Sequence, residues 1–152
     1  MEKQGSKSIG RRKFMKTSGL AAGGIMLAPS VLSAKAHIDG DDTIRIGLIG
    51  CGGRGTGAAI QALSSGQHVK LVAMADAFRD RLDKSYGQIK NELAVREMDA
   101  DMLSVSEDHK FDGFDGYKTV IAACEVVLIA TTPGFRPIHF EAAVEANKHV
   151  FM

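Results

Sequence analysis

Three glycines at a fixed spacing and one later carboxylate are the residues best suited to chemistry in this chain. Gly50, Gly52 and Gly55 form the pattern G-x-G-x-x-G directly after the apolar run 44–49. A chain with 17 glycines can produce this pattern by chance. Here a helical pattern follows it, and Asp76 ends the next apolar run. A strand before, a helix after and an acid beyond the next strand are the context that a dinucleotide-binding turn requires.

Each glycine of the turn has its own expected task. Gly50 allows the tight turn out of the strand, Gly52 lets a pyrophosphate approach the backbone, and Gly55 lets the helix pack closely on the strand. The amides and the dipole at the helix start then receive the phosphate charge. The Arg54 side chain either contacts a phosphate or is solvated. The expected phosphate-binding residues are Gly50, Cys51, Gly52, Gly53, Arg54 and Gly55.

Asp76 is expected to choose the cofactor. It lies 26 residues after Gly50, where an acid accepts hydrogen bonds from the adenosine ribose hydroxyls. A carboxylate there repels a 2′-phosphate, so NAD is favoured over NADP, whereas the nearby Arg79 argues for NADP. Asp76 could instead cap the next helix.

A methyltransferase is the main competing interpretation of the motif, since it also uses a glycine turn and an acid after the second strand. The order Gly-Cys-Gly-Gly-Arg-Gly at 50–55, which opens directly into an alanine-rich helix, favours the dinucleotide version.

Predicted strands and helices alternate through the rest of the chain. This alternation predicts the α/β class, a Rossmann-type parallel sheet with helices on both faces and right-handed crossovers. Asp115 is a candidate N-cap, and the acidic stretch 97–108 is expected to be a surface loop. In the last helix we expect Ile138, Ala142 and either Val144 or Ala143 to face the sheet. Strands are expected at 43–49, 69–75, within 109–114, at 125–130 and from 149, and helices at 54–65, 79–95, 117–123 and 137–146.

The composition is that of an ordinary globular protein, with a net charge of +1 and 45% hydrophobic residues. No long basic block follows the first sixteen residues, so nucleic acid is not an expected partner. The chain stops at 150–152 within an apparent strand, which suggests a fragment. We divide it into an export signal at 1–36, a linker at 37–42 and a C-terminally incomplete nucleotide-binding domain at 43–152.

The first 36 residues are typical of a twin-arginine export signal. Arg11 and Arg12 stand in a basic region, a short apolar stretch follows, and Ala34-Lys35-Ala36 is a candidate cleavage site. A spanning helix needs about 20 apolar residues, and Pro29 interrupts this stretch. A membrane anchor and a disordered cytosolic tail are the alternatives. A periplasmic or otherwise exported protein is therefore expected, which loads its cofactor before the twin-arginine machinery exports it.

The cysteines and histidines offer few other sites. Cys51 and Cys124 are expected at opposite ends of their strands, roughly 16 Å apart, too far for a disulfide. His139 is a low-ranking catalytic candidate, because its helix follows the ligand-binding edge. The other three histidines within 43–152 stand at strand starts, away from that edge: His68, His109 and His149. No spacing indicates a metal site.

Three segments resemble the Gfo/Idh/MocA oxidoreductases, the glucose–fructose oxidoreductase and inositol dehydrogenase family. They read IRIGLIGCGGRG, VKLVAMAD and EVVLIATTPGFRPIHFEAAVEANKHVFM. The resemblance implies that Thr131, Thr132 and Pro133 lie against the cofactor. Asn147 replaces the family's usual glycine, and Pro137 stands where it often has histidine. The family's Glu-Lys-Pro, with its catalytic or substrate-site lysine, would follow Met152.

The resemblance also implies a function. The full-length protein would be an NAD-dependent oxidoreductase for a carbohydrate-like substrate, such as a sugar, cyclitol or polyol, and a homo-oligomer through a second domain. The chain alone would then be inactive. An NAD-dependent glycoside hydrolase with a closed redox cycle is the alternative enzyme, and a non-catalytic nucleotide-binding module is the third interpretation.

Overall fold

The computed structural model describes residues 42–66 and 68–152. The predicted export signal and the linker up to residue 41 lie outside the described residues. The strands are β1 (Ile44–Ile49), β2 (Val69–Asp76), β3 (Lys110–Asp112), β4 (Val126–Ile129) and β5 (His149–Phe151). The helices are α2 (Gly53–Leu63), α3 (Arg79–Val95), α4 (Gly116–Ala123) and α5 (Arg136–Glu145), with short 3₁₀ turns η1 (Ala100–Met102) and η2 (Glu107–His109).

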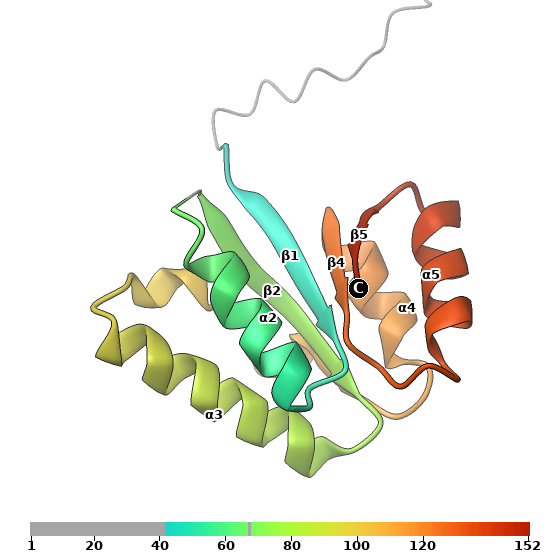
Figure 1. Cartoon of the computed structure of the whole chain (residues 1–152), viewed down its shortest axis with the longest axis horizontal. Coiled ribbons are helices and arrows are strands. Elements are labelled where there is room, and N and C mark those ends of the chain that lie inside the picture. The colour runs from blue at the N-terminus through green and yellow to red at the C-terminus, as the bar shows by residue number, and fades with distance from the viewer. Residues whose placement is uncertain (1–41, 67) are drawn as a thin grey trace, which may run out of the picture. The chain divides into compact units, whose positions relative to one another are not determined.

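The five strands form one parallel sheet in the order β3-β2-β1-β4-β5. The chain first runs outward from β1 to β3 and then returns through α4 to β4, on the other side of β1 (Figure 1). Ile49 at the end of β1 is in register with Ala75 of β2 and Ile129 of β4. The turns after these strands therefore meet at one edge, at the switch point where ligands bind in such sheets.

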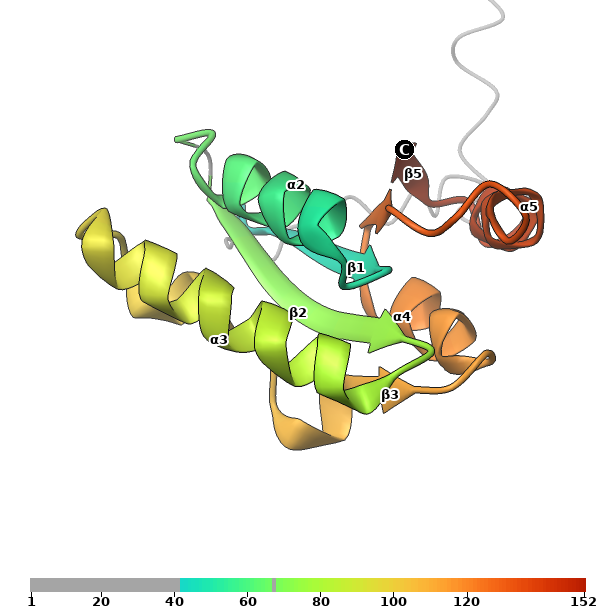
Figure 2. The ribbon, with the colours of Figure 1, turned by 60° about the horizontal axis from the view of Figure 1, so that its bottom comes forward.

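Two apolar layers hold the helices on the sheet. Leu63 of α2 and Leu82 and Ile89 of α3 pack in one buried cluster with strand residues. Val120 of α4 and Ala143 of α5 belong to a second cluster. The two helix pairs thus cover opposite faces, as Figures 1 and 2 show. The α/β prediction with helices on both faces is confirmed. In the described part of the chain, no helix is long and apolar enough to cross a membrane.

The stretch 97–108 is more ordered than the sequence predicted. It contains η1 and the start of η2. Val105 is buried, and Leu103 forms a parallel bridge with Leu71 of β2. Single apolar residues dock this segment on the sheet edge, and isolated anchors of this kind leave no periodic pattern to detect.

Asp115 occupies the predicted N-cap position of α4, but its side chain makes no capping hydrogen bond. Its carboxylate instead accepts a hydrogen bond from the ammonium group of Lys118 at 2.7 Å. The position was predicted correctly and the capping contact was not, because a charged partner one turn away competes for the same oxygen atoms.

The inward face of α5 was predicted in part: Ala143 is buried and Ala142 packs against the same cluster, as expected. Ile138 and Val144 are each more than half exposed, whereas His139 and Ala143 are buried. Residues 139 and 143 are four apart and so lie on one helix face. The histidine is tolerated there because Thr131 supplies a hydrogen-bond partner, a contact that hydrophobic periodicity cannot reveal.

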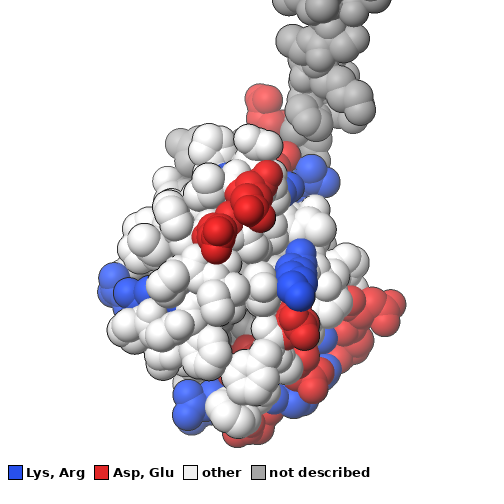
Figure 3. All heavy atoms as spheres, turned by 90° about the vertical axis from the view of Figure 1, so that its right-hand side faces the viewer, with Lys and Arg blue, Asp and Glu red and all other residues white. Residues whose placement is uncertain are grey.

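The outer side of α5 and the neighbouring β5 present an apolar surface. Figure 3 shows this side of the molecule, where a large area of residues other than Lys, Arg, Asp and Glu lies between separate groups of charged side chains. A broad apolar surface of this kind is more typical of a covered face than of a solvated one. Its exposed large side chains are Ile138, Phe140, Val144, Phe151 and Met152.

Candidate functional site

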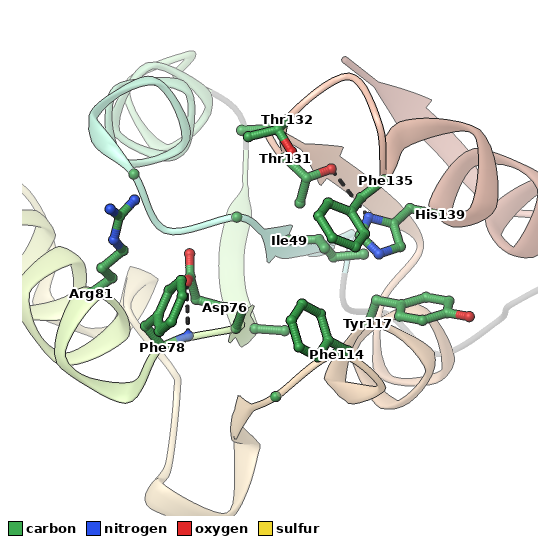
Figure 4. A pocket seen from close by; sticks show the side chains of 16 residues that line it. Ile49, Asp76, Phe78, Arg81, Phe114, Tyr117, Thr131, Thr132, Phe135 and His139 are labelled. Carbon is green, nitrogen blue, oxygen red and sulfur yellow. Dashed lines mark hydrogen bonds between the residues drawn. The ribbon is translucent and has the colours of Figure 1, made fainter.

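A pocket of about 330 Å³ opens at the carboxyl edge of the sheet, where β1, β2 and β4 end. Its size falls in the range of small-molecule sites. Ile49, Ala75 and Ala130 form its floor at the strand ends. Figure 4 shows Phe78 and Arg81 on one side of Asp76, and Phe114 and Tyr117 on the other. The pocket therefore lies at the position that the glycine turn and its acid predicted.

The glycine turn has the geometry that its three glycines were expected to provide. Gly50 has a φ of +96°, in the region that side chains disfavour. A Cβ on Gly55 would lie 1.9 Å from the Gly50 carbonyl oxygen, so only glycine allows this close packing. A Cβ on Gly52 would meet nothing within 4 Å. Gly52 is therefore not needed for packing, and it borders the open space of the pocket.

The Asp76 carboxylate joins three parts of the site. Its Oδ2 accepts a hydrogen bond from the Cys51 amide at 2.6 Å, and its Oδ1 accepts one from the Phe78 amide at 3.0 Å. Phe78 is the N-cap residue of α3. Asp76 is therefore not the helix cap that the alternative interpretation proposed: α3 has no side-chain capping hydrogen bond, and Asp76 bonds only the amide of the residue that precedes the helix. Each carboxylate oxygen has a second lone pair, so these bonds leave acceptor capacity for a ligand.

The two cysteines are free, buried thiols, as predicted. Burial, followed by the charge of Asp76, raises the pKa of the Cys51 thiol far above its ordinary value. Burial also raises the pKa of Cys124, to about 11. Both side chains are therefore protonated at neutral pH. Cys51 contributes its amide to the glycine turn, and its thiol is not a nucleophile.

The two arginines after Asp76 differ in position. Arg79, which the sequence pointed to, forms ion pairs with Asp83 at 3.1 Å and Glu107 at 2.8 Å. Arg81 lines the pocket, and its guanidinium carbon lies 5.6 Å from the centre of the Phe78 ring. Arg81 is thus the arginine that a bound ligand would meet. The sequence analysis did not identify Arg81. Helix geometry offered a signal, because residues 79 and 81 are two apart on α3 and so lie on different faces.

Thr131 and His139 come together on the β4 side of the pocket. The Thr131 hydroxyl lies 3.2 Å from Nδ1 of His139, and Thr131, Thr132 and His139 all line the pocket. The Arg136 Nε donates to the Thr131 carbonyl at 2.8 Å. Burial lowers the pKa of His139 below its ordinary value, so the imidazole is neutral at pH 7. Side chains of α5 therefore hold Thr131 at both its hydroxyl and its carbonyl.

An aromatic pair closes the side of the pocket opposite α2. Phe114 from the β3–α4 turn stacks on Phe135 from the β4–α5 turn, with centroids 5.7 Å apart and an interplanar angle of 23° (Figure 4). Both side chains remain exposed. No sequence pattern indicates this contact, because the two turns meet only after the sheet has formed.

The predicted site residues divide into two groups. Gly50, Gly52, Asp76, Thr131 and Thr132 line the pocket together with His139. Five others do not line it: Cys51, Gly53, Arg54, Gly55 and Pro133. Within the described residues, no three His, Cys, Asp or Glu side chains are arranged to hold a metal ion.

Comparison with known proteins agrees with the fold. The search against family models found no match. The chain is 30% identical over 144 residues to a glycosyl hydrolase family 109 protein of Solibacter usitatus (strain Ellin6076), which covers 92% of this chain and 31% of that protein. The chain thus spans about a third of the length of this relative.

Solved structures give the same architecture. The scyllo-inositol dehydrogenase of Lactobacillus casei with bound NAD(H) and scyllo-inositol superposes with a TM-score of 0.51 and 25% identity, over 72% of this chain and 27% of that one. A 3-ketoreductase of Actinomadura kijaniata in complex with NADP shares the fold, with a TM-score of 0.51 and 18% identity over 72% of this chain and 28% of that one. The chain has the Rossmann-type fold of dehydrogenase N-terminal domains, and an inositol dehydrogenase among its neighbours agrees with the resemblance found in the sequence.

Proposed function

We propose that this chain is the NAD-binding part of an exported Gfo/Idh/MocA-type oxidoreductase that acts on a sugar, cyclitol or related polyol. The observation that carries the proposal is the position of the Asp76 carboxylate, which bonds the glycine turn and faces the pocket at the switch point of the sheet. The similarity to an NAD(H)-bound scyllo-inositol dehydrogenase supports the cofactor and the substrate class.

The residues of the pocket fit a dinucleotide. The first amides of α2 have no acceptor within their own helix, and the open space beside Gly52 leaves room for a pyrophosphate there. Asp76 would accept hydrogen bonds from the adenosine ribose. Thr131 and Thr132, on the other side of the switch point, would border the nicotinamide half. When bound, the nicotinamide ring supplies hydride transfer; the residues of this chain bind and orient it.

The walls of the pocket suit the adenine end. Phe78 and Phe114 offer apolar and aromatic surface on the two sides of Asp76 (Figure 4). Arg81, over the Phe78 ring, adds a positive charge beside the expected ribose. This charge moderates the preference for NAD over NADP that Asp76 alone would set, because a 2′-phosphate would meet an attractive cation as well as a repelling carboxylate.

The rest of the enzyme belongs to the proposal by resemblance. A catalytic lysine would come from a Glu-Lys-Pro segment after Met152, and a second domain would supply most substrate contacts and a subunit interface. The twin-arginine pattern at 10–16 supports export to the periplasm with the cofactor already bound. An exported enzyme has little access to free nicotinamide nucleotides, so we expect it to retain the cofactor tightly.

An NAD-dependent glycosidase remains the alternative enzyme. The similarity to a family 109 glycosyl hydrolase is compatible with it. A retained nicotinamide cofactor would supply hydride transfer in both directions there: NAD⁺ would accept a hydride from the sugar, and the resulting NADH would return it after elimination and hydration. No net NADH would accumulate. A non-catalytic nucleotide-binding module would bind the cofactor and act on neither substrate type.

A cofactor-release experiment separates these functions. A protein that contains this chain together with its C-terminal continuation is purified and denatured, and the released nucleotide is identified. Polyols and aryl glycosides are then assayed. We expect bound NAD(H) and NADH formation with a polyol or sugar. Steady glycoside hydrolysis without net NADH would select the glycosidase, and the absence of any bound or bindable nucleotide would sink both enzyme proposals.

A further inference from the structure

The buried contact between His139 and Thr131 is unusual for a helix face that packs on a sheet. His139 is 7% exposed and lies one turn before Ala143 on the buried face of α5. Its ring lies 4.5 Å from the Tyr117 ring, centroid to centroid, and 6.3 Å from that of Phe135. Three elements thus meet around one imidazole: α4 through Tyr117, α5 through His139 itself, and the β4–α5 turn through Thr131.

The histidine is anchored while Thr131 borders the ligand space. Thr131 lies two residues after the end of β4, and a Cβ on Gly50 would lie 2.9 Å from the Thr131 backbone nitrogen. The glycine turn and the β4–α5 turn are therefore in close contact. A change in the Thr131 conformation would alter the pocket beside Gly50, at the side that borders the nicotinamide half of a bound dinucleotide.

A neutral imidazole can hold the Thr131 hydroxyl in one rotamer. The ring offers a hydrogen-bonding nitrogen at 3.2 Å, and packing against Tyr117 fixes the orientation of the ring. A threonine hydroxyl without such a partner turns among staggered positions. The contact thus removes conformational freedom from a residue of the binding site before any ligand arrives.

We propose that His139 is a positioning residue, which orders the Thr131 hydroxyl and the β4–α5 turn for the nicotinamide half of the dinucleotide. The inference rests on the proposed function of the pocket. It gives His139 a role in binding that differs from acid or base catalysis, and it assigns Thr131 as the residue through which His139 acts.

Calorimetric titration of the 152-residue chain with NAD⁺ and, separately, with 5′-ADP tests this assignment. ADP carries only the adenosine and phosphate half, so it serves as an internal control for the fold of the pocket. The variants are His139→Leu, Thr131→Val and the double variant, with His139→Asn as the conservative replacement. Asparagine places a polar group near the position of Nδ1, whereas leucine only fills the volume.

The expected result is a weaker affinity for NAD⁺, by about three- to tenfold in each single variant, the range for one lost hydrogen bond. ADP affinity should stay unchanged, the double variant should be no weaker than the singles, and His139→Asn should recover much of the loss. Where His139→Leu does not fold, His139→Gln, whose amide reaches past the Nδ1 position, replaces it in the comparison.

Two sets of results would overturn the assignment. Unchanged NAD⁺ affinity in His139→Leu, additive losses in the double variant, or an equal loss for ADP would each remove the positioning role and leave the proposed function standing. If the wild-type chain binds neither NAD⁺ nor ADP, the proposed function fails first, and the role of His139 falls with it.

Discussion

The Asp76 carboxylate accepts a 2.6 Å hydrogen bond from the Cys51 amide, and this contact joins the carboxyl end of β2 to the glycine turn after β1. The same carboxylate also holds the Phe78 amide at the start of α3. Asp76, which was expected to bind the adenosine ribose, therefore also helps to hold the glycine turn in place. Loss of its side chain should affect both the stability of the site and its choice of cofactor.

Asp76→Ala tests both effects. Removal of the acceptor from the partly buried Cys51 amide and the exposed Phe78 amide should lower the free energy of unfolding by about 1–3 kcal/mol, measured by urea denaturation. The ratio of the dissociation constants for NADP⁺ and NAD⁺ should move toward NADP⁺, because the charge that repels a 2′-phosphate is gone. An unchanged ratio would remove Asp76 from the ribose role, and unchanged stability would show that water replaces its hydrogen bonds.

Arg81 should contribute to NADP⁺ binding and Arg79 should not. Arg81 lines the pocket, while Arg79 is occupied by Asp83 and Glu107. We expect Arg81→Ala to weaken NADP⁺ binding by about tenfold, the effect of one charge-assisted hydrogen bond of roughly 1.5 kcal/mol, and NAD⁺ binding much less. Arg79→Ala is the matched control. An equal loss of NADP⁺ affinity in both variants would mean that the arginines act through the overall positive charge of α3, and that Arg81 makes no direct contact with the 2′-phosphate.

Gly55 should be irreplaceable for packing, in contrast to Gly57 on the same helix. A methyl group on Gly55 would clash with the Gly50 carbonyl, whereas one on Gly57 would meet nothing within 4 Å. Gly55→Ala should lower stability by about 3 kcal/mol or more, at the upper end for overpacking. Gly57→Ala should be neutral or raise stability by about 1 kcal/mol, because alanine favours helix. Comparable melting temperatures for the two variants would contradict the tight contact.

The stability of the chain should depend on pH through His139. Burial lowers the pKa of this imidazole from its ordinary value of 6.5, so the folded state holds the neutral form and the unfolded state takes up the proton more readily. The neutral, buried imidazole therefore adds to the free energy of unfolding above about pH 6.5, and this stabilisation is lost as the pH falls below that value. The ring meets Tyr117 from α4 and Thr131 from the β4–α5 turn, and neither supplies a carboxylate that would reverse the sign.

Urea denaturation from pH 7.5 to pH 5 measures this dependence. The wild-type chain should lose more stability over this range than His139→Asn, which cannot titrate. Parallel curves for the two proteins would mean that His139 titrates normally in the folded state. The two proteins differ only at residue 139, so the contributions of all other groups cancel in the comparison.

The sequence predicted the glycine turn and the acid of the site better than the side chains that surround the pocket. Gly50, Gly55 and Asp76 could be assigned because their tasks depend on local backbone geometry, which a short pattern encodes. Arg81 and the Phe114–Phe135 stack could not, because these contacts depend on the direction in which side chains leave distant turns. His139 was placed near the ligand edge, but its buried position required knowledge of the hydroxyl that faces it.

The most direct test of the dinucleotide site is NAD⁺ binding by the Gly52→Val variant. A Cβ at Gly52 meets no protein atom within 4 Å, and its φ of −74° is open to other residues, so the variant should melt at the temperature of the wild-type chain. Its added side chain would occupy the space assigned to the pyrophosphate. Calorimetry should show at least a tenfold weaker affinity for NAD⁺ in a fully folded protein; wild-type affinity in that variant would contradict the account.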